Sequence, residues 1–327
     1  MDFNFDVNLK DGFDNSKKLD IDTVYDIIVI GGGPAGLNAG LYSKRKGANV
    51  GIITKNIGGQ VVDTSVVENY LGYPSLSGEE LMNKFKDHVM DLDIPILEHS
   101  TVEGLKVSED SVIKEIVLSD GSSYKAKSII LATGSRPRKL SVPGEDEYVG
   151  KGVAYCAICD GPLFAGLDVV VAGGGNSAIE AAIDLSKIAN SVTIVHRSQL
   201  RADKILIDQI NKIKNIEVHL NTQILEVIGE KLVTGVKVLD KATDNIRTIS
   251  TNGIFVEIGA LPNNDPFKDI VELNDKGEII ADKFGRTNVE GIFAAGDSID
   301  NPYKQIIISA ATGANAALSA NEYLNTL

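Results

Sequence analysis

A glycine-rich turn that occurs twice is the sequence feature that most constrains the fold. The first copy, GGGPAG at 31–36, follows an apolar β-branched run at 25–30 and precedes a helical pattern at 37–46. The second copy, GGGNSA at 173–178, lies in the same way between an apolar run at 167–172 and a helical pattern at 179–189. In this strand–turn–helix context, glycines let the backbone approach a pyrophosphate at the N-terminus of the helix. The repeat therefore predicts two dinucleotide-binding units of α/β fold.

Between the two turns lie the only two cysteines of the chain, Cys156 and Cys159, in a C-x-x-C pattern. A zinc site needs four ligands, and the four histidines show no finger spacing, so we expect no metal. A purely structural disulfide would close a loop too short to stabilise the chain much. Two buried, inert cysteines remain an alternative, but this spacing favours a redox dithiol.

Asp160 stands directly after the second cysteine. A carboxyl group at this position can give a proton to a leaving thiolate or take one from a thiol. The alternative is a helix cap or a turn residue. We predict that Cys156, Cys159 and Asp160 form the catalytic group.

Length and charge set the outer limits. A chain of 327 residues exceeds the usual size of one hydrophobic core, so we expect two domains. The net charge of −13 argues against nucleic acid or an anionic membrane as the main partner. Neither an apolar run of transmembrane length nor a signal-peptide core is found, and a lone dithiol suits a reducing compartment, so we expect a soluble, cytoplasmic protein.

The order of the segments predicts that one domain is inserted into the other. Residues 1–23 lack periodicity and predict a flexible or loosely docked extension. A stretch rich in proline and charge at 136–144 marks a crossing between domains. The last segment, a strand at 287–297 that ends in Gly-Asp and a helix at 306–324, is too short for a domain and is expected to complete the first sheet. We therefore expect a first domain of 24–138 and 258–327, and an inserted domain of 139–257.

Two positions bear on the choice of dinucleotide. The strand expected at 49–53 ends at Thr54, where many such folds place an acid for a ribose hydroxyl. The strand at 191–195 runs into His196, Arg197 and Arg201, where a 2′-phosphate of NADP(H) would lie. A solvated basic turn is the alternative reading of these arginines.

Eight motifs in order make the chain from 25 to 324 resemble the low-molecular-weight thioredoxin reductases. They are GGGPAG at 31–36, GGQ at 58–60, VENYLGYP at 67–74, ATG at 132–134, CAICDG at 156–161, GGGNSA at 173–178, IGALPN at 258–263, and AAGD followed by YKQ at 294–305. The resemblance implies two Rossmann-like domains of three-layer ββα architecture, a homodimer, FAD in the first domain, and pyridine nucleotide and a redox disulfide in the inserted one.

The resemblance also implies the binding residues. Those expected at FAD are Gly31, Gly33, Pro34, Ala35, Gly36, Thr54, Gly59, Gln60, Asn69, Thr133, Gly134, Gly296, Asp297, Lys304, Gln305 and Ile306. Those expected at the pyridine nucleotide are Gly173, Gly175, Asn176, Ser177, His196, Arg197 and Arg201.

The chain departs from the family pattern at two of these places. Ser198 stands where the family usually has a second arginine, and the loss of one charge-assisted hydrogen bond would weaken 2′-phosphate binding about 10- to 150-fold. Lys304 stands where the family usually has arginine, which exchanges a planar fork for a point charge.

The implied activity is thioredoxin-disulfide reduction, with hydride from NADPH passing through FAD to the Cys156–Cys159 disulfide and on to thioredoxin or a similar protein. Alternatives are a flavin-dependent disulfide reductase fed by NADH or reduced ferredoxin, a dithiol oxidase, and a non-catalytic redox-sensing flavoprotein. In the family the second cysteine, here Cys159, lies nearer the flavin, and the inserted domain rotates about linkers near Lys139 and Ile258.

Overall fold

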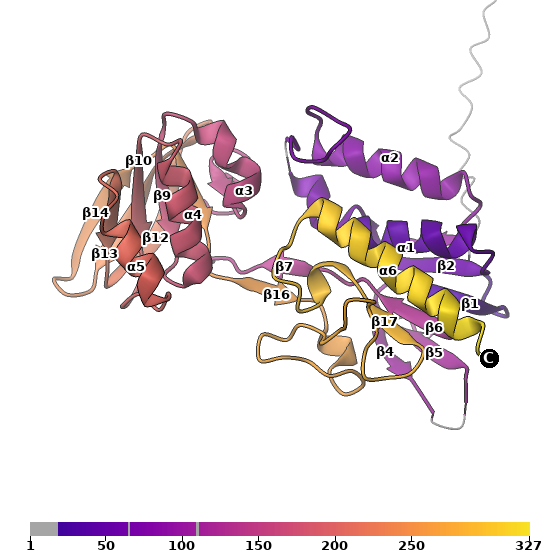
Figure 1. Cartoon of the computed structure of the whole chain (residues 1–327). Helices are drawn as coiled ribbons and strands as arrows, with labels where there is room; N and C mark the ends of the chain where they lie inside the picture. The colour runs from indigo at the N-terminus through magenta and orange to yellow at the C-terminus, as the bar shows by residue number, and fades with distance from the viewer. Residues whose placement is uncertain (1–18, 65, 109–110) are drawn as a thin grey trace, which may run out of the picture.

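The computed structural model describes residues 19–64, 66–108 and 111–327, and it has two lobes joined by a narrow ribbon (Figure 1). Most of the predicted extension, residues 1–18, lies outside the described residues. Its last part is described, and there Leu19 is buried against Gly51, whose missing side chain leaves room for it.

The first lobe is built on a mixed sheet with the strand order β3-β2-β1-β6-β5-β4, in which β17 also pairs with β6. The strands that pair in parallel are β1 (Val24–Gly32), β2 (Val50–Ile57), β3 (Ile96–Leu97), β6 (Ser123–Leu131) and β17 (Ile292–Ala294). Two further strands, β4 (Val102–Lys106) and β5 (Lys114–Leu118), pair in antiparallel fashion. Because β17 lies near the C-terminus and pairs with β6, the end of the chain completes the sheet that its beginning forms, as predicted.

Three helices pack on one face of this sheet (Figure 1): α1 (Pro34–Arg45), α2 (Gly78–Met90) and α6 (Ile306–Leu324). Helices α1 and α6 lie so close that a Cβ at Gly313 would be 2.1 Å from the carbonyl oxygen of Ala35. The close contact brings the start of α6 beside the first glycine turn. Short 3-10 helices lie in the connections of this lobe: η1 (Gly59–Asp63), η3 (Asp265–Phe267) and η4 (Gly296–Ser298).

The second lobe has three layers. Its parallel sheet has the order β11-β10-β9-β15-β8, with β8 (Val153–Ala154), β9 (Asp168–Ala172), β10 (Ser191–Val195), β11 (Ile216–His219) and β15 (Gly253–Val256). One face carries α3 (Ala157–Asp160), η2 (Gly161–Phe164), α4 (Asn176–Ser186) and α5 (Lys204–Ile210). The other face packs on an antiparallel sheet of β12 (Thr222–Gly229), β13 (Val233–Asp240) and β14 (Asn245–Ser250). The predicted α/β class with two Rossmann-like units is confirmed.

The chain passes between the lobes through a two-stranded ribbon of β7 (Ser135–Pro137) and β16 (Ala260–Pro262). The N–H of Arg138 donates to the carbonyl oxygen of Gly259 at 2.9 Å, so both crossings lie side by side at the edge of the second lobe. Among the described residues, no helix is long and apolar enough to cross a membrane.

Candidate active site

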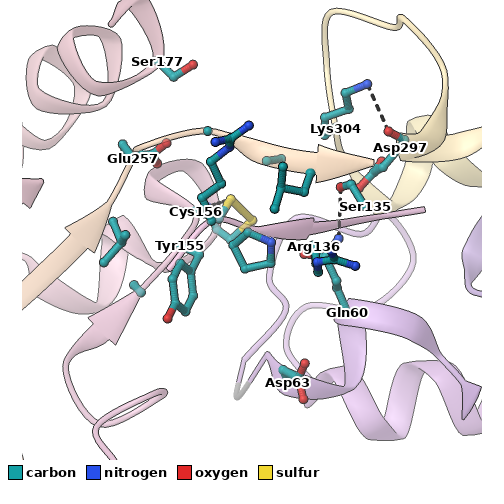
Figure 2. Close-up of a pocket in the computed structure, with 18 of the residues that line it drawn as sticks. Gln60, Asp63, Ser135, Arg136, Tyr155, Cys156, Ser177, Glu257, Asp297 and Lys304 are labelled. Carbon is teal, nitrogen blue, oxygen red and sulfur yellow. Dashed lines mark hydrogen bonds between the residues drawn. A yellow bond between two sulfur atoms is a disulfide. The ribbon is translucent and has the colours of Figure 1, made fainter. Parts of the chain in front are cut away.

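Both glycine turns and the two cysteines line one cavity of about 2460 Å³ between the lobes. This is several times the volume of a typical site for one drug-sized ligand, so it has room for more than one dinucleotide. All but two of the residues expected at the site line it. Figure 2 shows Cys156 between Ser177 and Glu257 of the second lobe and Gln60, Ser135 and Asp297 of the first.

The two residues that do not line the cavity support its walls. Gly36 packs against the first turn, where a Cβ would be 1.9 Å from the carbonyl oxygen of Gly31. The side chain of Asn176 is committed to Asp203: its Nδ2 donates to Asp203 Oδ2 at 2.9 Å, and the Asp203 N–H donates to its Oδ1 at 2.8 Å. Asn176 therefore fastens the basic loop to the start of α4.

The dithiol lies where β8 gives way to the short helix α3. Cys156 and Cys159 form a disulfide, and Cys156 Sγ also accepts a hydrogen bond from the N–H of Cys159 at 3.2 Å. Both cysteines are half-buried, whereas Ile158 between them is 61% exposed. One side of the disulfide therefore faces the cavity while the adjacent surface is open to a large partner.

Asp160 ends α3, and burial raises the pKa of its carboxyl group to about 6. A carboxyl group with this pKa exists in both protonation states near neutral pH, as a proton-exchanging group requires.

The raised pKa of Asp160 predicts a change in stability with pH. Because the native pKa lies above the unfolded value of 3.8, the ionised form destabilises the fold, and this penalty grows as the pH rises from about 4 to 6. We expect Asp160→Asn to raise the melting temperature at pH 7–8 and to have no such effect at pH 3.5. The measurement is thermal unfolding of both proteins across this pH range.

Asp120 offers a control of opposite sign for that measurement. Hydrogen bonds from Ser122 lower the pKa of Asp120, so its ionised form stabilises the fold. Asp120→Asn should lower the melting temperature at pH 7. An Asp160→Asn protein that shows the same difference from wild type at pH 3.5 and at pH 8 would contradict the prediction.

On the first lobe, polar side chains from distant segments meet at the cavity. Asn69 Nδ2 donates to Gln305 Oε1 at 3.2 Å, and Gln60 Nε2 donates to Ser135 Oγ at 3.3 Å. The hydroxyl group of Thr54 is buried and donates to the carbonyl oxygen of Asn56 at 2.8 Å, so it is satisfied within its own strand end.

Asp297 and Lys304 are held differently from each other. Asp297 accepts a hydrogen bond from Ser309 Oγ at 2.8 Å, and burial raises the pKa of its carboxyl group. The Lys304 ammonium group donates to the carbonyl oxygens of Asp297 and Ile299 and forms an ion pair with Glu278 at 2.9 Å. The charge of Lys304 is thus used to fix the loop that carries Asp297.

On the second lobe, His196 is buried beneath the second glycine turn, and its Nε2 lies 3.2 Å from Ser198 Oγ. Burial, and then the charges of Arg201 and Arg197, lower the pKa of His196. Both arginines are exposed at the cavity, and no ion pair among the described residues engages either guanidinium group. They are available for an anionic group of a ligand.

Several residues that hold the site were missed from the sequence. Asn264 is buried and accepts a hydrogen bond from Thr133 Oγ1 at 2.9 Å. Glu145 is buried and accepts one from Tyr155, the residue before Cys156. Glu257 Oε1 accepts the N–H of Ala157, between the cysteines, at 3.4 Å. No local pattern reveals these contacts, since the partners lie 10 to 131 positions apart.

The residues present fit two dinucleotides. A Cβ at Gly33 or Gly175 would meet nothing within 4 Å, so the backbone at both helix starts is open to the cavity, as phosphate binding requires. Asp297 points a half-buried carboxyl group into the cavity, a partner suited to the hydroxyl groups of a flavin's sugar chain. The first lobe thus suits FAD and the second a pyridine nucleotide.

Comparisons with known proteins agree with this geometry. An alkyl hydroperoxide reductase subunit of Pseudomonas putida is 44% identical over 315 residues, which are 96% of this chain and 61% of that protein. An NADH dehydrogenase of Ferdinandcohnia aciditolerans is 44% identical over 317 residues, or 97% of this chain and 60% of that protein. The chain thus spans about 60% of the length of these curated relatives.

The fold and the family are shown by two further matches. The thioredoxin reductase of Streptococcus pyogenes superposes with a TM-score of 0.88 at 36% identity, covering 93% of this chain and 99% of that structure. The family model described as pyridine nucleotide-disulphide oxidoreductase matches residues 25–316. The chain therefore belongs to the pyridine nucleotide-disulphide oxidoreductases.

Proposed function

We propose that this protein is an FAD-dependent reductase of protein disulfides, with thioredoxin or a thioredoxin-like protein as its partner. The observation that carries the proposal is that the Cys156–Cys159 disulfide and both nucleotide turns line one cavity. Bound FAD would supply a two-electron relay between a pyridine nucleotide and the disulfide. The half-buried dithiol next to exposed Ile158 suits contact with a protein rather than only a small molecule.

The residues of the chain have distinct parts in this proposal. Cys159 is the sulfur on the flavin side, as the resemblance implies, and Cys156 is the one that attacks the partner's disulfide. Asp160 holds the proton that a thiolate takes up or releases. The ribbon of β7 and β16 is the hinge about which the second lobe turns, so that the dithiol serves the cavity and the partner alternately. The domain boundaries that we propose lie at this ribbon.

A second candidate function is the supply of electrons to an alkyl hydroperoxide reductase system. It is favoured by the 44% identity to a component of such a system, which exceeds the 36% identity to the thioredoxin reductase structure. The dithiol chemistry would be the same in both cases. Only the partner would differ, being a peroxide-reducing protein with a redox disulfide.

The experiment that tests these proposals is an anaerobic titration of the purified yellow protein. Stoichiometric bleaching of the flavin by NADPH or NADH, followed by return of the colour on addition of oxidised thioredoxin, is the expected result. Return of the colour only with a peroxide-reducing protein would favour the second candidate. Bleaching that no protein disulfide reverses would overturn both.

For the electron donor we propose NADPH, on the strength of Arg197 and Arg201. Arg201→Ala is expected to raise the dissociation constant for NADPH about 10- to 150-fold, because a charge-assisted hydrogen bond to the 2′-phosphate is lost. NADH, which lacks that phosphate, should bind the variant about as well as wild type. Equilibrium titration of both nucleotides measures the two effects.

Arg247 provides the matched control for this substitution. It is exposed in the same lobe and contacts His219 instead of the cavity. Arg247→Ala should leave both dissociation constants within about twofold of wild type. Equal weakening of NADPH and NADH binding in Arg201→Ala would show that the arginine does not recognise the 2′-phosphate.

A further inference from the structure

Glu257 brings a second carboxyl group to the dithiol from a strand that the sequence motifs do not mark. It directly follows β15, and its N–H donates to the carbonyl oxygen of Ala172 at 2.8 Å, which continues the pairing with β9. Its side chain leaves the end of the sheet towards α3 and lines the cavity (Figure 2). There Oε1 accepts the N–H of Ala157 at 3.4 Å.

The position of this contact relates Glu257 to one particular sulfur. Ala157 directly follows Cys156, in the same way that Asp160 directly follows Cys159. For Cys159, the next residue in the chain is itself an acid, Asp160. For Cys156, the next residue is Ala157, whose N–H donates to the carboxyl group of Glu257. Glu257 therefore approaches the backbone next to Cys156, as Asp160 stands next to Cys159.

We propose that Glu257 is a second proton-exchanging residue of the dithiol, which shares one proton with Cys156 as Asp160 serves Cys159. The inference rests on the proposed function in one respect, namely that the dithiol reacts with a partner disulfide. It adds a proton-exchanging residue that the family motifs do not include.

A helix cap alone is a poorer explanation of Glu257. A carboxylate that caps a helix is held in its ionised form, and its pKa falls. The opposite is found here, since burial raises the pKa of Glu257 to about 7 and outweighs the hydrogen bond from Ala157. Thiols of C-x-x-C motifs as a class titrate in an overlapping range, which is the condition for two groups to share a proton.

The protonation of Glu257 depends on the titratable and charged groups around it. Cys156 directly precedes α3, and Cys159 and Asp160 lie on it, whereas the loop after β9 carries only glycines at 173–175. Charged residues of other neighbouring elements that line the same cavity are Glu180 and Asp184 on α4 and Arg138 at the ribbon. Tyr155 on the β8 side is bonded to Glu145, and no ion pair among the described residues involves Glu257.

The proton balance of the exchange step is simple. When the Cys156 sulfur attacks a partner disulfide, its thiol proton passes to the Glu257 carboxylate, one sulfur–sulfur bond forms and the partner's bond breaks. The thiolate that the partner releases then takes this proton from Glu257. Attack by Cys159 on the mixed disulfide releases the second partner thiol, with its proton passing through Asp160. Two thiols are oxidised and one disulfide is reduced.

The test uses the Cys159→Ser holoprotein, in which Cys156 is the only thiol of the chain. The rate of alkylation by iodoacetamide is measured from pH 5.5 to 9, with and without the further change Glu257→Gln, which keeps an oxygen for the Ala157 N–H. Above pH 7 the ionised Glu257 opposes formation of the thiolate. We expect the Gln variant to react about three- to tenfold faster at pH 8 and at the same rate at pH 6, where both side chains are neutral.

Glu230→Gln is the control, because Glu230 is an exposed carboxyl group at the turn between β12 and β13 and should leave the profile unchanged. A ratio of rates in the Glu257→Gln protein that does not change with pH would overturn the inference. Alkylation requires neither pyridine nucleotide nor a partner, so its outcome is independent of whether thioredoxin proves to be the substrate.

Discussion

Cys159→Ser is expected to abolish reduction of a protein disulfide, with turnover at least about a thousandfold below wild type. The reason is that the single remaining sulfur, Cys156, cannot form the internal disulfide that stores and releases an electron pair. Serine is close to cysteine in size, and Cys159 is only half-buried, so the fold should tolerate the change. The measurement is thioredoxin reduction with saturating NADPH.

The same variant contains its own control. Its flavin should still be bleached by the pyridine nucleotide at the wild-type rate, because the glycine turns and Arg201 are untouched. Bleaching without turnover would place the block at the dithiol. An unaltered rate of thioredoxin reduction would show instead that electrons leave by another route.

Glu145→Ala is expected to have the largest effect on stability, lowering the free energy of unfolding by about 2–4 kcal/mol. Glu145 is 1% exposed, and its carboxyl group accepts three hydrogen bonds. Two come from the N–H groups of Leu140 and Ser141, at 2.9 and 2.6 Å, and the third from the Tyr155 hydroxyl at 3.1 Å. Alanine would leave all three donors without this acceptor, and denaturant unfolding measures the loss.

Two further variants show how much of this loss of stability comes from single hydrogen bonds. Tyr155→Phe removes one of the three bonds and should cost about 1 kcal/mol. Glu230→Ala, at an exposed turn, should change stability by less than about 0.5 kcal/mol. If Glu145→Ala unfolds at the same denaturant concentration as wild type, the three bonds contribute nothing net to the fold.

The elements that could be predicted best have local signals. The helical spacing of residues 78–90 predicts a helix there, and α2 covers these residues, with a reciprocal capping box of Ser77 and Glu80 at its start. The redox pair could likewise be predicted from its spacing. From the sequence alone, residues 122–126 and 128–134 suggest two strands; this division is wrong, because Ser123–Leu131 form the single strand β6. Lys127, the charged residue between the two stretches, stays within the strand and forms an ion pair with Asp26 at 2.8 Å.

What could not be predicted depends on contacts between distant segments. Within the predicted strand at 287–297, only Ile292–Ala294 is a strand, since Thr287 Oγ1 donates to the carbonyl oxygen of Ile292 and folds the preceding residues into a loop. The pairing of Asn69 with Gln305 spans 236 positions. The reach of Glu257 to Ala157 depends on how β15 and α3 end, which no window of sequence contains.

The ribbon between the lobes has a consequence for how such a chain can be built and rearranged. Its two strands enter and leave the second lobe as direct neighbours, joined by the hydrogen bond from Arg138 to Gly259. The sheet of the first lobe therefore does not depend on which domain is inserted at the ribbon. If residues 139–258 were removed, a short peptide could join the two new chain ends. The whole inserted domain can therefore be exchanged for another at this ribbon without changes to the core of the first lobe.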